Sequence, residues 1–288
     1  PQLKKELEKR EAQGIIQRIN VPTDWCSPTV IAPKKSGNIR LCVDLRQLNK
    51  AVARERFIIP TVEEVLGRIC GAQIFSLLDA KHGFWQVPLT DESQKLTTFI
   101  TPFGRFCFRR LPFGITSAPE TYQRIMSDLL AGISGVVVYM DDVLITGHTK
   151  EEHDDRLQQV LQTMQHAGLK LNKDKCKIAQ TRVDFLGMKL DKDGIHPDPA
   201  KVAAVIQMAP PTTKEEVKHL MGMVNWLARF IPSASSVAAP INDLLRGNVN
   251  WTWGPSQQSA FRNIKKLLTS APTLAFYDPS LPTMISAD

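Results

Sequence analysis

Five short runs of apolar and β-branched residues, each bounded by turn-forming residues, predict β-strands in the first half of the chain. They cover Thr29–Ala32, Ile39–Val43, Gln73–Asp79, Thr97–Ile100 and Phe106–Arg109. The first run is separated from the second by only a few residues, and the fourth from the fifth, so each of these two pairs predicts a hairpin. The third run ends in an acid, Asp79.

Helical spacing of apolar residues and N-terminal capping boxes predict the helices. The stretch Gln2–Ile19 has its apolar side chains at roughly helical spacing, and Ser117–Leu130 is a second helix candidate. Capping boxes at residues 61–64, 149–152 and 213–216 each predict a helix start. The helix after the second box is predicted to end at Gly168 and to have one apolar face, formed by Leu157, Val160, Leu161 and Met164.

The last third of the chain is mainly helical in pattern. Phe185–Leu190 predicts one more strand, and helical spacing takes over from Pro199. This change predicts a domain boundary near Gly194. An amphipathic helix is predicted after Trp253, and the chain ends in a strand-like run, Thr283–Ala287.

Two adjacent acids lie between two strongly apolar β runs. Asp141 and Asp142 separate residues 135–139 from residues 143–146. Within a strand, adjacent side chains point to opposite faces, but at the tip of a hairpin both can project from one edge. If the strand that ends in Asp79 is a neighbour, three carboxylates converge, and together they suit two Mg²⁺ ions that promote phosphoryl transfer. The alternative is a solvated Asp-Asp turn.

The composition is that of a folded protein with a modest basic excess. Of the 288 residues, 43% are hydrophobic and 23% are charged, which argues against disorder and suggests about two domains. The net charge of +7 suits a polyanionic partner, but it also suits an ordinary basic protein. The five cysteines are scattered, without a C-x-x-C pair. This argues against a zinc site or a disulfide framework and favours a reduced, intracellular setting.

The apolar runs and the N-terminal stretch bear on localisation. No apolar run is long enough to span a bilayer, and no secretory signal segment is recognisable, so we expect no membrane partner. The chain begins with Pro1, and we interpret it as a piece of a longer translation product.

Five motifs stand in a fixed order along the chain. They are Leu41–Arg46 with Leu48–Lys50, Phe75–Asp79 with Gly83–Leu89, Leu111–Gly114 with Ser117–Pro119, Tyr139–Asp142, and Phe185–Gly187. In these motifs the chain resembles the reverse transcriptase of gypsy-type LTR retrotransposons (metaviruses). The resemblance extends over nearly the whole chain from about Gly14 onward.

The resemblance implies an α+β, right-hand polymerase with fingers, a palm built on an antiparallel sheet, and a helical thumb. The fingers would comprise residues 1–75 and 92–118, the palm 76–91 and 119–194, and the thumb or connection 195–250. Residues 251–288 resemble the truncated start of an RNase H-like domain, in which Asp288 aligns with the first metal-binding acid. The other acids of that site would lie beyond the end, so we expect no RNase H activity from this chain alone.

The implied activity is RNA-directed DNA polymerisation, in which dNTPs are joined to a primer 3′-hydroxyl on an RNA or DNA template. Asp79, Asp141 and Asp142 would bind two Mg²⁺ ions, or Mn²⁺ in their place, and the carbonyl of Ala80 would be a further ligand. The implied partners are the template–primer duplex, dNTPs and the remainder of a Pol polyprotein, in a cytoplasmic virus-like particle. The oligomeric state does not follow from the sequence.

The resemblance also implies residues that bind the incoming nucleotide. Arg40, with Lys34 or Lys35, would contact the triphosphate, although a solvated hairpin tip is the alternative. Phe84 would face the sugar and exclude a ribose 2′-hydroxyl, whereas the alternative is a core aromatic. Phe113 would line the same pocket, at a position where retroviral relatives often have Gln.

Two further implied roles stay open. Lys173 or Lys175, in a basic cluster after the long helix, would protonate the leaving pyrophosphate as a general acid, but contact with backbone phosphates or a solvated edge also accounts for this cluster. A segment after this cluster resembles a primer grip, although packing equally accounts for its apolar residues. It consists of Phe185, Leu186, Gly187 and Met188.

Two other functions compete with reverse transcription. One is a relative that only binds nucleic acid, and the other is a viral RNA-directed RNA polymerase. The complete acid trio argues against the first. Against the second, Phe84 and the methionine before the acid pair favour DNA synthesis, because an RNA polymerase needs a smaller or hydrogen-bonding group near the 2′-hydroxyl.

Overall fold

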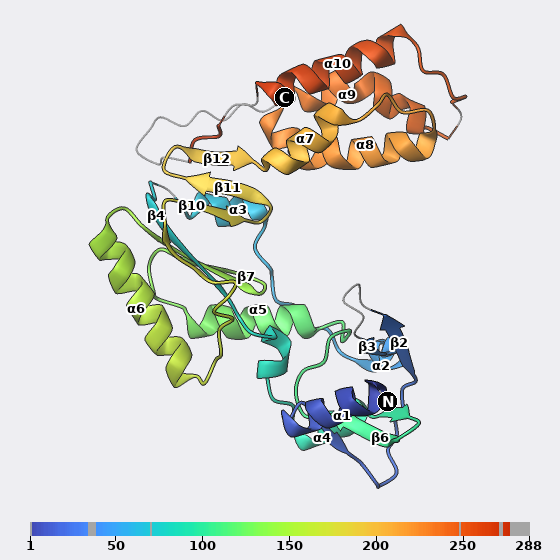
Figure 1. Cartoon of the computed structure of the whole chain (residues 1–288), viewed down its shortest axis with the longest axis vertical. Coiled ribbons are helices and arrows are strands. Elements are labelled where there is room, and N and C mark those ends of the chain that lie inside the picture. Colours follow the sequence, from blue (N-terminus) through green and yellow to red (C-terminus); the bar gives the residue numbers. More distant parts are fainter. Residues whose placement is uncertain (1, 34–38, 70, 248, 271–272, 277–288) are drawn as a thin grey trace. The chain divides into compact units, whose positions relative to one another are not determined.

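The computed structural model describes residues 2–33, 39–69, 71–247, 249–270 and 273–276 (Figure 1). They fall into two compact units, each discontinuous in sequence. The first comprises Pro1–Thr61, Ser76–Ile145 and Asp154–Ile178, and the second comprises Val62–Phe75, Thr146–His153 and Ala179–Asp288. No helix in the described part of the chain combines the length and the apolar character needed to cross a membrane.

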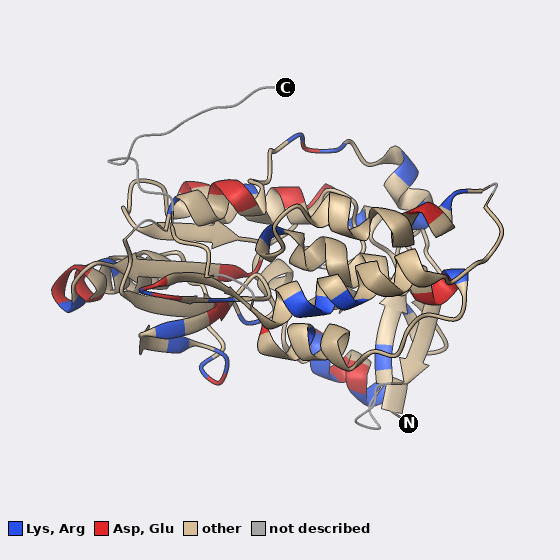
Figure 2. Ribbon diagram, turned by 90° about the horizontal axis from the view of Figure 1, so that it is seen from above, with Lys and Arg blue, Asp and Glu red and all other residues tan. Residues whose placement is uncertain are grey.

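The N-terminal part of the first unit is built on a three-stranded antiparallel sheet of order β1-β6-β5. The strands are β1 (Ile16–Arg18), β5 (Phe99–Thr101) and β6 (Gly104–Phe108). Leu3 and Leu7 of helix α1 (Gln2–Ala12) pack on these strands. Helix α1 has charged residues of both signs (Figure 2).

The sequence prediction of a helix over Gln2–Ile19 is wrong in its second half. The helix ends at Ala12, because Gly14 adopts a positive φ of 67°. Ile16 then pairs with Phe108 in the sheet and is almost fully buried. Ile15 and Ile16 are therefore core residues at the start of a strand and not part of a helix.

Two predicted hairpins of the first unit are confirmed. Strands β2 (Thr29–Pro33) and β3 (Ile39–Val43) pair antiparallel and are followed by helix α2 (Arg46–Ala51). Their tip, which includes Lys34 and Lys35, lies outside the described residues. The β5–β6 hairpin forms with bounds shifted by a few residues, and helix α4 (Asp91–Leu96) precedes it.

The first unit also contributes strands to a four-stranded sheet of order β7-β8-β4-β9. Its strands are β4 (Ile74–Asp79), β7 (Val136–Tyr139), β8 (Asp142–Gly147) and β9 (Lys177–Gln180). Helices α5 (Ala118–Leu129) and α6 (Lys150–His166) contribute to one hydrophobic core with these strands. That core contains Leu78, Tyr122, Met126, Val143, Ile145, Val160 and Met164.

Most of the predicted apolar face of α6 is confirmed. Val160 and Met164 are buried, and Leu157 packs against them at the edge of the core. Leu161 is 38% exposed, so its assignment to this face is wrong. A residue that directly follows Val160 is turned by about 100° around the helix axis.

The second unit contains helix α3 (Val62–Gly67) and a three-stranded antiparallel sheet of order β10-β11-β12. The strands are β10 (Arg182–Phe185), β11 (Met188–Asp191) and β12 (Gly194–Pro197). The single strand predicted over Phe185–Leu190 is wrong. Leu186 and Gly187 both have positive φ values, of 50° and 71°, and form a two-residue hairpin turn between β10 and β11.

In the described part of the second unit, four α-helices follow β12. They are α7 (Pro199–Gln207), α8 (Lys214–Leu227), α9 (Ala234–Asn242) and α10 (Pro255–Thr269). The side chains of Asp198 and Thr213 accept backbone hydrogen bonds at the starts of α7 and α8, which confirms the predicted helix starts. The amphipathic helix predicted after Trp253 is α10, but Thr283–Ala287 and Asp288 lie outside the described residues.

Candidate active site

The acid pair lies at the tip of the β7–β8 hairpin. Tyr139 and Asp142 are the last paired residues, so Met140 and Asp141 form a two-residue turn. Met140 has a positive φ of 53°, which a non-glycine residue adopts only at a cost of about 1–2 kcal/mol. The predicted hairpin is confirmed, and both acids are at one edge of the sheet.

Gln123 of α5 holds this turn through its side-chain amide. Its Oε1 accepts a hydrogen bond from the N–H of Met140 at 2.6 Å, and its Nε2 donates to the carbonyl of Val138 at 2.9 Å. Nε2 also donates to Oγ of Ser127 at 3.1 Å. Gln123 is only 1% exposed, so water does not replace these bonds. The strained turn is therefore fixed from the neighbouring helix.

Asp79, at the end of β4, is connected to the same hairpin. The N–H of Ala80 donates to the carbonyl of Asp141 at 3.4 Å. The N–H of Asn172 donates to the carbonyl of Asp79 at 2.9 Å, and Nζ of Lys175 lies 3.0 Å from Oδ2 of Asp79. Lys175 is therefore the one of the two candidate lysines that reaches the acids.

The electrostatics of the three acids favour a cation. Burial raises the pKa of Asp141, the charge of Asp79 raises it further, and Lys175 opposes both effects. Burial likewise raises the pKa of Asp142, followed by the charges of Asp79 and Asp141. Crowded, partly desolvated carboxylates repel one another, and a divalent cation relieves this repulsion.

The candidate ligands suit Mg²⁺, because the carboxylates of the three acids and the backbone carbonyl of Ala80, the residue after Asp79, are all hard oxygen ligands. Within the described residues, however, no three acidic, histidine or cysteine side chains come close enough to share one metal ion. Asp79 is bound to Lys175 instead. Metal binding through Oδ2 of Asp79 therefore requires the metal to displace the ammonium group of Lys175.

Gly83 leaves room beside the acid pair. A Cβ atom at this position would lie 2.8 Å from Oδ1 of Asp141 and 2.8 Å from the hydroxyl of Tyr122, so any larger residue would displace one of them. The hydroxyl of Tyr122 is buried and has no hydrogen-bond partner in the described structure. Burial and the charges of Asp141 and Asp79 raise the pKa of Tyr122, so it stays neutral.

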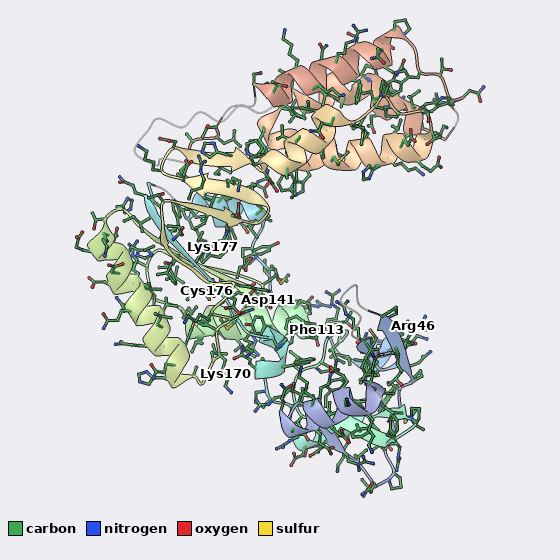
Figure 3. All side chains as sticks on the ribbon, in the orientation of Figure 1. Arg46, Phe113, Asp141, Lys170, Cys176 and Lys177 are labelled. Atoms are coloured by element: carbon green, nitrogen blue, oxygen red, sulfur yellow. The ribbon has the colours of Figure 1, made fainter. Side chains whose placement is uncertain are left out.

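Two of the predicted nucleotide-binding residues, Phe84 and Phe113, meet in an aromatic cluster. The ring centres of Phe84 and Phe113 are 5.0 Å apart, and those of Phe84 and Tyr122, which meet edge to face, are 5.5 Å apart. Phe113 is 53% exposed, and Figure 3 labels it together with Asp141. A cavity of about 560 Å³ is lined by both Phe113 and Arg40. The structure thus brings Arg40, Phe84 and Phe113 together.

The predicted primer grip is the β10–β11 turn of the second unit. Phe185 and Met188 are buried, whereas Gly187 is exposed at the turn. A Cβ atom at Gly187 would lie 2.6 Å from Nζ of Lys201 and 2.9 Å from Cζ2 of Trp226. Packing in the core accounts for the apolar side chains of Phe185 and Met188. A role of the β10–β11 turn as a primer grip stays a prediction.

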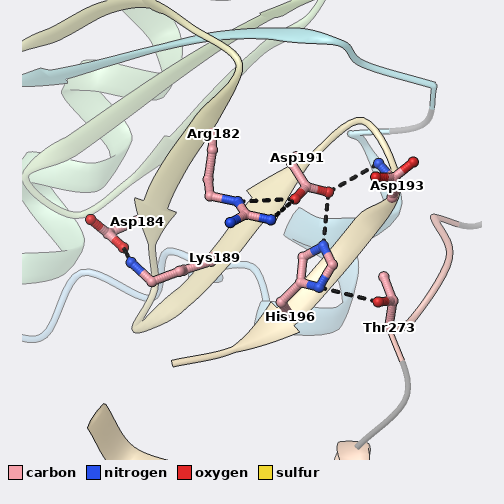
Figure 4. A network of polar contacts seen from close by, with 7 residues as sticks. All are labelled: Arg182, Asp184, Lys189, Asp191, Asp193, His196 and Thr273. Carbon is pink, nitrogen blue, oxygen red and sulfur yellow. Dashed lines mark hydrogen bonds and ion pairs between the residues drawn. The ribbon is translucent and has the colours of Figure 1, made fainter. Parts of the chain in front are cut away.

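A polar network joins β10, β11 and β12 (Figure 4). The carboxylate of Asp191 accepts hydrogen bonds from Nε of Arg182 at 3.0 Å and from the N–H of Asp193 at 3.0 Å, and it lies 2.8 Å from Nε2 of His196. Burial raises the pKa of Asp191, but these partners outweigh burial and lower it to about 2. Nδ1 of His196 lies 3.1 Å from Oγ1 of Thr273, so His196 has a structural role.

Residues 32–190 match the model of the family described as reverse transcriptase (RNA-dependent DNA polymerase). The chain belongs to this family. Two relatives from Schizosaccharomyces pombe, the transposon Tf2-3 and Tf2-7 polyproteins, are 35% and 34% identical to it over 285 residues. The alignments cover 98% of this chain and 21% of each polyprotein, so the chain spans about a fifth of these relatives. The resemblance to retrotransposon reverse transcriptases is confirmed.

Solved structures confirm the fold class of a right-hand polymerase. The foamy viral protease-reverse transcriptase dRH in complex with double-stranded DNA has a TM-score of 0.87 and 25% identity, over 97% of this chain and 50% of that one. A second foamy viral protease-reverse transcriptase structure with double-stranded DNA has a TM-score of 0.83 and 26% identity, over 98% and 59%. A third, with an RNA/DNA hybrid, shares the fold at a TM-score of 0.83 and 24% identity, over 97% and 38%.

Sequence reasoning missed Gln123 and Tyr122 as residues of the candidate site. A signal for Gln123 exists in the sequence. It shares a helix face with Met126 and Leu130, at spacings of three and seven residues, and an amide on an apolar face requires hydrogen-bond partners. Its two partners in the hairpin, Val138 and Met140, lie 15 and 17 residues further along the chain, so no local pattern identifies them.

Proposed function

We propose that this chain is an RNA-directed DNA polymerase that transfers nucleotides from dNTPs to a primer 3′-hydroxyl on an RNA or DNA template. The observation that carries the proposal is the acid pair at the hairpin tip, hydrogen-bonded to the residue after Asp79 and partly desolvated. Such a site suits divalent cations, and bound divalent cations stabilise the negative charge that accumulates on phosphoryl oxygens during phosphoryl transfer.

Asp79, Asp141 and Asp142 would hold two Mg²⁺ ions, with Mn²⁺ as a substitute and the carbonyl of Ala80 as a further ligand. When bound, the ions supply activation of the primer hydroxyl and neutralisation of the triphosphate. Gln123 keeps the acid pair in position, and Tyr122 stays neutral beside it. Lys175, which contacts Asp79, would donate a proton to the leaving pyrophosphate as a general acid, a role for which Lys173 is the alternative.

The cavity beside Phe113 would receive the incoming nucleotide. Arg40 lines this cavity and would bind the triphosphate, assisted by Lys34 or Lys35. Phe84, held between Phe113 and Tyr122, would face the sugar and reject ribonucleotides. Phe113 would give this side of the pocket an aromatic side chain, at a position where retroviral relatives often have a hydrogen-bonding Gln.

The proposed macromolecular partner is a template–primer duplex. The foamy viral neighbours are described in complex with double-stranded DNA and with an RNA/DNA hybrid. The helices after Gly194 would act as a thumb and the β10–β11 turn as a primer grip. We also propose that the chain works as part of a longer Pol polyprotein product, as the identity to transposon polyproteins suggests, within a cytoplasmic virus-like particle.

Primer extension tests the proposal. The folded chain is incubated with an RNA template annealed to a DNA primer, Mg²⁺, and either dNTPs or rNTPs, and Asp141→Asn serves as the control. Extension with dNTPs, lost in the variant, supports the assignment. If the wild-type chain binds the template–primer but extends it with neither nucleotide set, it is a nucleic-acid-binding relative without polymerase activity. Preferential extension with rNTPs would indicate an RNA polymerase.

A further inference from the structure

Arg10 is a buried cation on α1. The residue is 7% exposed, and its Nε donates to Oε1 of Glu6, one turn earlier, at 2.9 Å. Its guanidinium carbon lies 5.1 Å from the centre of the Trp85 ring. Burial of a guanidinium is costly unless a carboxylate and an aromatic face compensate for lost water. Arg10 is therefore held in one position, against Trp85.

Arg10 and Trp85 also form part of the wall of the proposed nucleotide pocket. Together with His82 they line the cavity of about 560 Å³ that contains Arg40 and Phe113. The same three side chains line a second cavity, of about 400 Å³, on the side of α1. They therefore lie between the two cavities, and the position of Trp85 decides how the nucleotide pocket is shaped on this side.

Ring contacts connect Trp85 to the predicted sugar gate. The ring centres of Trp85 and Phe113, which meet edge to face, are 5.8 Å apart, and those of Phe113 and Phe84 are 5.0 Å apart. The indole N–H of Trp85 is buried and has no hydrogen-bond partner in the described structure, so no hydrogen bond orients this ring. Its orientation depends on packing, and Arg10 supplies the charged contact on one face.

We propose that Arg10 is a positioning residue of the nucleotide pocket, which acts through Trp85 on Phe113 and Phe84. It thereby sets the affinity for the incoming dNTP and the discrimination against rNTPs. The inference rests on the proposed polymerase function. It extends that function, because Arg10 lies outside the motifs that carry the resemblance.

Single-nucleotide incorporation by Arg10→Met, Arg10→Lys and Arg18→Met tests this inference. Arg18 is a matched control in the same unit, because its guanidinium carbon lies 4.9 Å from the ring centre of Phe106 and its Nη1 donates to the carbonyl of Phe103 at 2.8 Å. The measurements are KM for dNTP, kcat, the dNTP/rNTP ratio of kcat/KM, and template–primer affinity. Circular dichroism verifies folding.

Loss of the contact in Arg10→Met should raise KM for dNTP about tenfold and lower the dNTP/rNTP ratio, with little change in kcat or template–primer affinity. Arg10→Lys keeps a cation over the ring and should recover most of the loss. Arg18→Met should match the wild type. If Arg10→Met does not fold, Glu6→Gln, which leaves the guanidinium without its carboxylate, replaces it and should shift KM in the same direction.

The inference is overturned if a folded Arg10 variant keeps the wild-type KM and ratio, or if Arg18→Met shifts both equally. These results are distinct from failure of the proposed function, in which the wild-type chain itself incorporates no nucleotide. That outcome would overturn both proposals, since no nucleotide pocket would then exist for Arg10 to shape.

Discussion

Replacement of Gln123 by methionine tests whether α5 holds the β7–β8 hairpin, which carries the acid pair, in position. Methionine has nearly the same volume, so the change removes the hydrogen bonds without opening a large cavity. Three bonds are lost, to Met140, Val138 and Ser127. At about 1 kcal/mol of net stability each, the free energy of unfolding should fall by about 3 kcal/mol, and the unpartnered N–H of Met140 adds to this loss.

The effect on catalysis should be larger than the effect on stability suggests. Without Gln123, the positive φ of Met140 is no longer enforced, and the turn can relax. A displacement of reacting groups by about 1 Å costs roughly 100-fold in rate. We therefore expect single-turnover incorporation of a dNTP to slow about 100-fold, with template–primer affinity unchanged.

Gln94→Met is the matched control. Gln94 is 8% exposed, its Nε2 donates to the carbonyl of Leu89 at 2.9 Å, and its Oε1 accepts from Nε2 of Gln17 at 2.9 Å. This variant should lose comparable stability in urea denaturation and keep the wild-type incorporation rate. If folded Gln123→Met incorporates dNTP as fast as Gln94→Met does, Gln123 does not position the acids and the reasoning is refuted.

Three further predictions concern the sugar gate, the acid pair and the second unit. Phe84→Val should increase rNTP relative to dNTP incorporation at least about tenfold, and an unchanged ratio would contradict the gate. In Lys175→Met without metal, the pKa values of Asp141 and Asp142 should rise further, because Lys175 lowers both. Unchanged or lower pKa values of these two carboxyl groups in NMR titrations of the variant would contradict this. Asp191→Asn should cost about 2 kcal/mol of unfolding free energy at neutral pH. The folded-state pKa of Asp191 is lowered from 3.8 to about 2, so this loss should shrink as pH falls from 3.8 toward 2, and a pH-independent loss would count against the network.

The acid site was predictable because its residues stand at the ends of apolar strands. Asp79 ends β4 and Asp142 begins β8, and both positions follow from the local pattern of apolar residues. The support from Gln123 was not predictable in the same way, because its partners are set by the packing of α5 on the hairpin. Arg10 is a similar case, since its charge is typical of a helix surface and only the tertiary structure buries it against Trp85.

The errors in secondary structure have a common cause. Periodicity of apolar residues does not show where the backbone adopts a positive φ. Gly14 ends α1 before Ile16, and Leu186 with Gly187 divides a continuous apolar run into two strands. Leucine is uncommon in this conformation, so the apolar pattern favoured an uninterrupted strand.

The central claim is that Asp79, Asp141 and Asp142 bind divalent cations that support dNTP incorporation. The most direct measurement is the single-turnover rate of dNTP incorporation on an RNA template–primer as a function of Mg²⁺ concentration, for the wild type and Asp142→Asn. We expect a Mg²⁺-dependent rate for the wild type and, for the variant, a loss of rate that saturating Mg²⁺ does not restore. Incorporation by Asp142→Asn at the wild-type rate and with the same Mg²⁺ dependence would contradict metal binding by these acids.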